Sequence, residues 1–232
     1  MKAAHARSDN DSQVLRISID TKSKIRLGEF SRGGKLRCFD PVKALDHDMT
    51  PTGILVPLGI LEVKQKQLNI VYGNSFETSD FIVDGLEHWW RYHKRHYDNI
   101  TLLQIDLDNG PEIESYRTQF IKRMVEFSDT IQLPIEFVYY PPYHSKYNPV
   151  EHCWGVLESH WSGALLTEWD VVLKWTRSMC WGGLAPNVYR LADEYHRGVK
   201  LTKQEMRYYE ERLVRTPDIG RWSLKIQPHR RG

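Results

Sequence analysis

The stretch YYPPYHSKYNPVEHCW, residues 139–154, decides how the rest of the chain is interpreted. Two tyrosines end an apolar run, prolines interrupt it, and a helical pattern begins after Asn148. Asn148 suits the N-cap position of a helix, and Pro149 suits the first helical position, where its missing N–H is no loss. The stretch therefore predicts a buried strand, a proline-rich turn and the first turn of a helix.

Glu151 falls at the third position of that predicted helix. A carboxylate there meets the positive end of the helix and can form a capping pair with Asn148. It also lies beside an apolar face, at the mouth of the fold, where it could hold a metal ion. Apolar residues recur at helical spacing along that face, at Val150, Trp154, Leu157 and Trp161. The stretch alone favours the capping role, so the other acids of the chain have to decide between the two.

Composition indicates a globular protein with an ordinary core. The chain has 232 residues, of which 41% are hydrophobic and 27% charged. A formal net charge of +2 gives no indication of nucleic-acid binding, although basic side chains cluster between Lys22 and Arg37 and at the C-terminal end. Three scattered cysteines argue against a disulfide framework or a zinc knuckle. Without a signal peptide or an apolar run of membrane length, we expect a cytoplasmic protein.

Apolar periodicity around the opening stretch predicts alternating strands and helices. In chain order, the predicted elements are strands at 14–19, 25–30 and 53–72, a helix at 78–97, a strand at 100–107, a helix at 116–127, a strand at 134–140 and the helix after Asn148. We expect the first two strands to pair as a hairpin. Hairpin strands followed by strands joined through helices are the order of a ribonuclease-H-like fold. That fold is of the α/β class, here a mixed five-stranded sheet with helices on both faces.

This order also predicts how the chain divides. Residues 14–163 contain the ribonuclease-H-like domain, and the polar residues 1–13 before it predict a flexible tail. Residues 164–214 carry further helical patterns and predict a C-terminal helical extension. Residues 215–232 predict an irregular basic tail.

Three acids occupy comparable places in the predicted order. Asp20 ends the first strand, Asp108 follows the strand at 100–107, and Glu151 begins the last helix of the domain. In a ribonuclease-H-like sheet the first and fourth strands are neighbours, so Asp20 and Asp108 are expected to lie together with Glu151 brought to them. Converging carboxylates raise each other's pKa unless a cation offsets their charge. Oxygen ligands select Mg²⁺ or Mn²⁺, and two such ions about 3.5–4 Å apart support in-line displacement at phosphorus.

Each acid also has a simpler interpretation. Asp20 can be a turn acid at a strand end, and Asp108 can be the first residue of a tight Asp-Asn-Gly turn. Two further acids are rival ligands, because Asp106 points to the same side of its strand as Asp108 and Glu158 lies two helical turns beyond Glu151. The residues alone leave these alternatives open.

Two motifs together resemble a known family. LDNG after a strand, residues 107–110, combined with YPPYHSKYNPVEHCW before a helix, residues 140–154, resembles the DDE transposases of bacterial insertion sequences. Within their mariner-like superfamily, the chain resembles the ISAzo group. IDTKSKIRLGEFSRGGK, residues 19–35, is similar to the opening of that catalytic domain. The resemblance runs from about Val14 to about Leu213.

The resemblance implies a function and a set of site residues. By position, the family's catalytic acids fall on Asp20, Asp108 and Glu151, as ligands of two Mg²⁺ or Mn²⁺ ions. It implies cleavage and strand transfer of double-stranded DNA, at element ends and target, by a homo-oligomer on the prokaryotic nucleoid, with no membrane. The basic side chains expected to contact DNA are Lys22, Lys24, Arg32, Lys35, His144, Lys146, Arg230 and Arg231.

One departure from the family limits this expectation. Only 19 residues precede Asp20, too few for the N-terminal helical domain with which such transposases recognise element ends. The resemblance therefore predicts a catalytic domain alone, from a truncated or split gene. The alternatives are a nuclease or resolvase of the same fold, and a non-catalytic remnant that only binds DNA or oligomerises.

Overall fold

The computed structural model describes residues 1–35, 37, 39–40, 43–45, 50–141, 147–217, 220 and 223–229. The elements, in chain order, are α1 (Lys2–Asn10), β1 (Val14–Thr21), β2 (Ile25–Leu27), β3 (Gly53–Glu62), β4 (Gln67–Gly73), α2 (Ser79–His93), the 3₁₀ turn η1 (Lys94–His96), β5 (Leu102–Leu107), α3 (Thr118–Ile131), β6 (Ile135–Tyr139), α4 (Pro149–His160), α5 (Trp169–Ser178), β7 (Asn187–Arg190), α6 (Lys203–Glu210), β8 (Leu213–Arg215) and β9 (Ser223–Ile226). None of the helices in these described ranges is long and apolar enough to cross a membrane.

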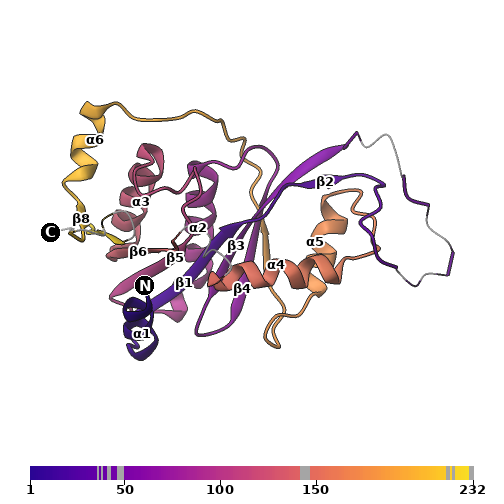
Figure 1. Cartoon of the computed structure of the whole chain (residues 1–232), viewed down its shortest axis with the longest axis horizontal. Coiled ribbons are helices and arrows are strands. Elements are labelled where there is room, and N and C mark those ends of the chain that lie inside the picture. Colours follow the sequence, from indigo (N-terminus) through magenta and orange to yellow (C-terminus); the bar gives the residue numbers. More distant parts are fainter. Residues whose placement is uncertain are drawn as a thin grey trace.

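A mixed sheet organises the molecule (Figure 1). Its strand order is β7-β4-β3-β1-β5-β6-β9-β8, with β2 pairing β3 off this path. β1 lies near the middle, antiparallel to β3 and parallel to β5. The first and fourth predicted strands are therefore neighbours, as the expected fold requires.

Alternation along β1 sends its side chains to two different layers. Ile17 and Ile19 enter the core shared with α2 and α3, while Ser18 and Asp20 bond to residues of α4 on the other face. Figure 1 shows α2 and α3 on one side of the strands and α1 and α4 on the other. A second apolar cluster lies between the sheet and the helices α4 and α5. The acid at the end of β1 thus faces α4.

The expected mixed sheet with helices on both faces is confirmed, but within the described residues it has nine strands rather than five. The segment expected to be a helical extension contains β7 and β8, and the segment expected to be a basic tail contains β9. These strands have four, three and four residues. Segments this short show no clear alternation of apolar and polar residues, so the sequence does not reveal them as strands. Pairing with strands already in the sheet stabilises them.

The expected hairpin between the first two strands does not form. β3 is ten residues long, and its second half pairs with β1 up to the pair Thr21–Leu58. β2 pairs with the first half of β3, where Arg26 lies opposite Ile54. Because β1 already has β3 and β5 on its two edges, β2 can only continue along β3 beyond the end of β1.

Residues 1–13 differ from the expected flexible tail, because Lys2–Asn10 form α1. The helix has no apolar stripe and packs on the sheet through charged contacts. Arg7 bonds to Glu136 of β6, and Asp9 accepts from Arg16 Nη1 at 2.9 Å. A helix held by ionic contacts to distant strands leaves no amphipathic pattern in its own sequence.

Candidate active site

Asp20 and Asp108 lie at the ends of two neighbouring strands. β1 and β5 are parallel, with Ser18 opposite Asp106. Continuing this register by two residues brings Asp20 and Asp108 to the same edge of the sheet. Both side chains are partly buried, and the Gly110 N–H donates to Asp108 Oδ1 at 3.1 Å.

The helix α4 brings Glu151 to this edge. It begins at Pro149 with Asn148 in the N-cap position, as predicted, but the Asn148 side chain makes no cap bond. Instead, Ser18 Oγ of β1 accepts from the Val150 N–H at 3.1 Å. Asn148 accepts from the Ser18 hydroxyl and donates Nδ2–H to the Ile19 carbonyl oxygen at 3.0 Å. The start of α4, with Glu151 in its first turn, is therefore bonded to β1 within two residues of Asp20.

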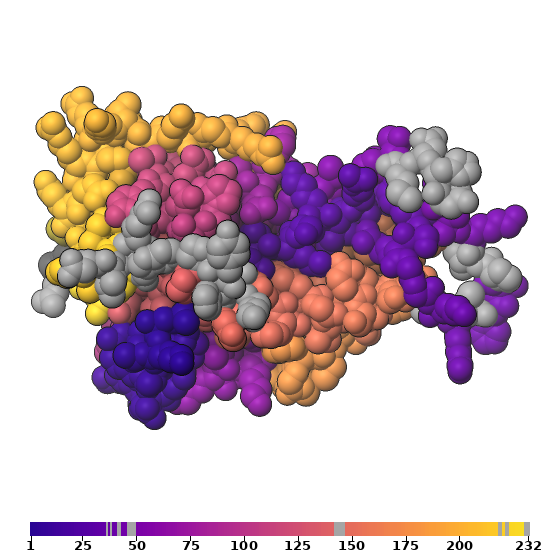
Figure 2. All heavy atoms as spheres, viewed as in Figure 1, coloured from indigo at the N-terminus to yellow at the C-terminus, as the bar shows by residue number. Residues whose placement is uncertain are grey.

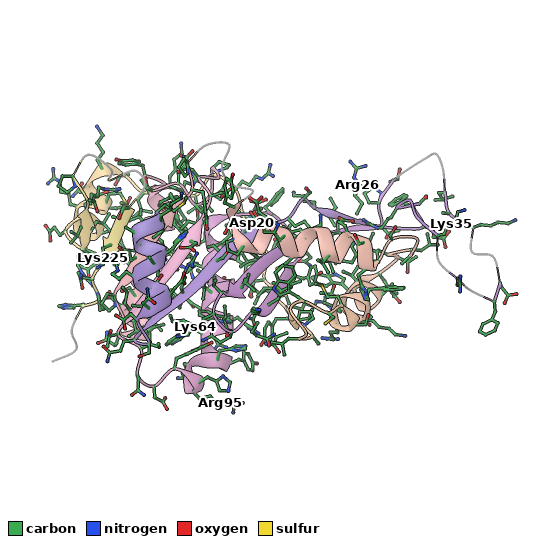
Figure 3. All side chains as sticks on the ribbon, turned by 60° about the horizontal axis from the view of Figure 1, so that its bottom comes forward. Asp20, Arg26, Lys35, Lys64, Arg95 and Lys225 are labelled. Carbon is green, nitrogen blue, oxygen red and sulfur yellow. The ribbon has the colours of Figure 1, made fainter. Side chains whose placement is uncertain are left out.

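Trp154 is the site residue that the sequence did not identify. Its Nε1–H donates to Asp20 Oδ2 at 2.7 Å, and its side chain is buried. The sequence placed Trp154 on the apolar face of the helix, which is correct. The available signal was chemical, because a buried indole N–H needs an acceptor. Figure 3 shows Asp20 beside the first part of α4.

Burial and neighbouring charges control the ionisation of the acids. Burial raises the pKa of Asp20 to about 7, against the Trp154 hydrogen bond, and the charges of Asp108 and Glu151 raise it further. Burial also raises the pKa of Asp108, against the hydrogen bond from the Gly110 backbone. The three acids predicted from the sequence are therefore close enough for the other two charges to disfavour ionisation of Asp20.

The donor chemistry of these acids fits Mg²⁺ or Mn²⁺. Among the residues that the structure describes, no three His, Cys, Asp or Glu side chains are arranged so that they could hold one ion as they stand. Three carboxylates whose charges oppose one another are nevertheless the kind of oxygen ligands that these hard cations prefer. A divalent cation would offset the repulsion that Asp108 and Glu151 exert on Asp20.

The two rival acids have other partners. Asp106 is fully buried and accepts from Arg16 Nε at 2.7 Å and from Gln104 Nε2 at 3.0 Å. Glu158 pairs with Lys22 Nζ at 2.7 Å and accepts from Trp161 Nε1 at 2.8 Å. Each carboxylate is thus balanced by a cation of the protein itself.

The basic residues predicted to contact DNA lie partly on an arm, which we define as residues 22–35. Figure 2 shows the chain beyond β1 extending from the body at one end, and Figure 3 shows Arg26 and Lys35 along it. Lys24 Nζ lies 5.2 Å from the centre of the Phe76 ring, and Lys35 is exposed. Arg32 Nη2 donates to the Arg26 carbonyl oxygen at 2.8 Å.

The remaining predicted DNA contacts are Lys22, which forms an ion pair with an exposed acid of α4, and four residues outside the described part of the chain. Lys22 is the partner of Glu158 at the inner end of the arm. Four others lie outside the described residues: His144, Lys146, Arg230 and Arg231.

Comparison with known proteins identifies the relatives of this chain. Residues 2–228 match the family described as the Rhodopirellula transposase DDE domain. No protein of curated function matches the sequence. The fold is similar to that of the Mos1 transposase in a paired-end complex with the left transposon end, with a TM-score of 0.51, 11% identity, and coverage of 75% of this chain and 50% of that chain.

A second similar structure is the Mos1 strand transfer complex, with a TM-score of 0.49, 10% identity, and coverage of 75% of this chain and 49% of that chain. The chain therefore spans about half the length of the solved structures it matches. At such low identity the likeness to the paired-end complex concerns the fold, which is ribonuclease-H-like.

Proposed function

This chain belongs to the transposase DDE-domain family, and from that membership we propose that it cleaves DNA strands and transfers them to new positions with the help of divalent metal ions. Asp20, Asp108 and Glu151 are the proposed metal ligands. The observation that carries the proposal is the placement of these acids: Asp20 and Asp108 lie at the ends of the neighbouring parallel strands β1 and β5, and Glu151 lies in the first turn of α4, which is bonded to β1. Burial and the nearby charges of Asp108 and Glu151 raise the pKa of Asp20.

A bound cation would offset the negative charge that Asp108 and Glu151 place around Asp20. Bound Mg²⁺ or Mn²⁺, with two ions in the full site, would supply charge stabilisation for in-line displacement at phosphorus and a more acidic attacking hydroxyl. The chain itself contributes the ligands from rigid elements. Two come from the ends of β1 and β5, and Glu151 comes from the first turn of α4.

The proposed substrate is double-stranded DNA, both the ends of a mobile element and its target, in the nucleoid of a prokaryotic cell. The arm offers Lys22, Lys24, Arg32 and Lys35 for phosphate contacts. The sequence adds His144 and Lys146 shortly before α4, and Arg230 and Arg231 near the C-terminal end. Contacts of this kind are electrostatic and weaken steeply with salt. A homo-oligomer on paired ends is part of the proposal, because strand transfer needs two ends held together.

The test is metal-dependent chemistry on DNA. Purified protein is incubated with Mn²⁺ and a duplex made from the DNA that flanks its gene, and both nicking and joining of a pre-cut end to a plasmid are measured. We expect Asp108→Asn to lose both activities. Asp98→Asn, which removes an exposed carboxylate in the loop after η1, is the matched control and should retain them.

The alternatives give different results in the same assays. Nicking that survives Asp108→Asn would overturn the proposed site. Metal-dependent nicking without joining would indicate a nuclease of the same fold. DNA binding without either activity in the wild-type chain would indicate a non-catalytic DNA-binding module.

A further inference from the structure

The hydrogen bond between Trp154 and Asp20 connects α4 to a proposed metal ligand. Trp154 lies one helical turn after Glu151, and its Nε1–H reaches Asp20 Oδ2 at 2.7 Å. Only 7% of Trp154 is exposed, so little water competes for this N–H. The indole bond engages Oδ2 of the carboxylate, and the carboxylate also accepts a hydrogen bond from the Thr21 backbone.

The neighbouring strand β3 leaves room for the indole ring of Trp154. Gly59 of β3 lies directly opposite Asp20 in the pairing of β1 with β3. A Cβ atom at Gly59 would lie 2.7 Å from Trp154 Cζ2 and 2.8 Å from Val150 Cγ2. Any side chain there would have to displace the ring or the helix, so glycine permits the close approach of α4 to the sheet.

A second contact holds the same helix to the same strand. Ser18 Oγ accepts from the Val150 N–H, and Val150 and Trp154 are four residues apart on one face of α4. Ser18 and Asp20 are likewise on one face of β1. The helix is therefore attached to the strand at two points, and Glu151 lies between them along the chain.

We propose that Trp154 is a positioning residue, whose N–H holds Asp20 Oδ2 and so orients this carboxylate toward the ion bound with Asp108 and Glu151. The inference rests on the proposed function, because it assigns a role toward the same metal ligand. Hydrogen bonds to a ligating carboxylate orient it, and their loss typically weakens metal binding by about 10–100-fold.

A buried indole bonded to a carboxylate can also be purely structural, and the chain contains a matched example. Trp89 of α2 is fully buried and donates Nε1–H to Glu62 Oε1 at 2.8 Å. It belongs to the core on the opposite face of the sheet from α4. Trp89→Phe therefore removes the same kind of bond from a place with no proposed metal ligand.

The experiment measures Mn²⁺ binding to the full chain by titration calorimetry. We expect Trp154→Phe to raise the dissociation constant by about tenfold or more, and Trp89→Phe to stay within about twofold of the wild-type chain. Thermal unfolding without metal is measured for both variants, because a general loss of stability would affect both alike. Equal Mn²⁺ affinity of Trp154→Phe and Trp89→Phe would overturn the positioning role.

Asp20→Asn separates this proposal from the one on which it rests. If the wild-type chain and Asp20→Asn bind Mn²⁺ equally, the proposed metal site fails. If Asp20→Asn loses binding while Trp154→Phe keeps it, only the role of Trp154 fails. Should Trp154→Phe not fold, Gly59→Ala decides the question. The Gly59→Ala variant keeps the indole but crowds it away from Asp20. If Trp154 positions Asp20, the Mn²⁺ affinity of Gly59→Ala must be lower than that of Trp89→Phe.

Discussion

Ser18 of β1 caps the helix α4, because its hydroxyl oxygen accepts a hydrogen bond from the Val150 backbone N–H at 3.1 Å. Caps are usually supplied by the residue just before the helix. Here the N-cap residue Asn148 turns its side chain toward β1, donating to the Ile19 carbonyl oxygen and accepting from Ser18. The capping bond therefore also attaches the helix carrying Glu151 to the strand carrying Asp20.

Removal of this hydroxyl should destabilise the fold. We expect Ser18→Ala to lower the free energy of unfolding by about 1–3 kcal/mol, because Val150 N–H and Asn148 Oδ1 lose their partner in a buried place. Urea unfolding measures the change. The control is Thr202→Ala, which removes the side-chain cap of the surface helix α6. This change should lower the free energy of unfolding by about 1 kcal/mol or less. A smaller effect at Ser18 than at Thr202 would contradict this role.

Stability without metal should depend on pH through Asp20. The carboxylate has a pKa of about 7 in the folded chain and of about 3.9 when unfolded. Between these values the folded state binds more protons than the unfolded state, so the free energy of unfolding falls as pH rises. The full destabilisation, which is the penalty of an ionised Asp20 in the folded chain, is present above about pH 7. Asp20→Asn removes the penalty.

We therefore expect Asp20→Asn to be more stable than the wild-type chain at pH 8, by about 1–2 kcal/mol once solvent screening is considered. The advantage should shrink toward pH 5. The measurement is urea unfolding in EDTA at several pH values. An unchanged difference between the two proteins from pH 5 to pH 8 would show that Asp20 does not titrate in this range.

Metal ions should stabilise the folded chain through the three acids. At a Mn²⁺ concentration about 100 times the dissociation constant, the gain is about 2.7 kcal/mol. We expect a rise in melting temperature for the wild-type chain and for Asp98→Asn, and little rise for Asp108→Asn or Glu151→Gln. Because protons compete for Asp20 below its pKa of about 7, the rise should be larger at pH 8 than at pH 6. Equal stabilisation of all four proteins would place the ion elsewhere.

Asp106 should be essential for stability and dispensable for metal binding. Its carboxylate is fully buried against Arg16 Nε at 2.7 Å. Asp106→Asn leaves the guanidinium without its main partner, and breaking a buried pair in this way costs about 3–5 kcal/mol. We expect the melting temperature to fall while the folded fraction binds Mn²⁺ with wild-type affinity. Loss of Mn²⁺ affinity in the folded protein would instead make Asp106 a ligand.

Charge reversal on the arm should weaken DNA binding and its dependence on salt. Lys24 and Lys35 are exposed on the arm. Each phosphate contact contributes about 0.9 to the slope of log affinity against log salt concentration. We expect Lys24→Glu with Lys35→Glu to reduce that slope by about 1–2. Fluorescence anisotropy with a labelled duplex measures it, and Lys203→Glu on α6, at the other end of the molecule in Figure 1, is the control. A slope unchanged by the arm variants would exclude the arm from the DNA contact.

The sequence by itself determined the local elements and the family. Thr78 caps α2 by accepting from the Phe81 N–H, β5 and β6 follow apolar runs, and α4 begins at Pro149 as predicted. Each of these depends on residues a few positions apart, whose backbone preferences and apolar spacing are visible in the sequence. The motifs around Asp108 and Glu151 were also enough to predict the transposase family that the comparisons confirm.

Only the tertiary structure decided which side chains meet. Ser18 and Val150 are 132 residues apart in the chain, and Asp20 and Trp154 are 134 apart. A sequence can show that an indole or an acid must find a partner when it is buried, but several partners satisfy that requirement equally well. The choice depends on the register of β1 against β3 and β5, and on the space that Gly59 leaves for α4. Both are set by the packing of the whole sheet, which no local pattern contains.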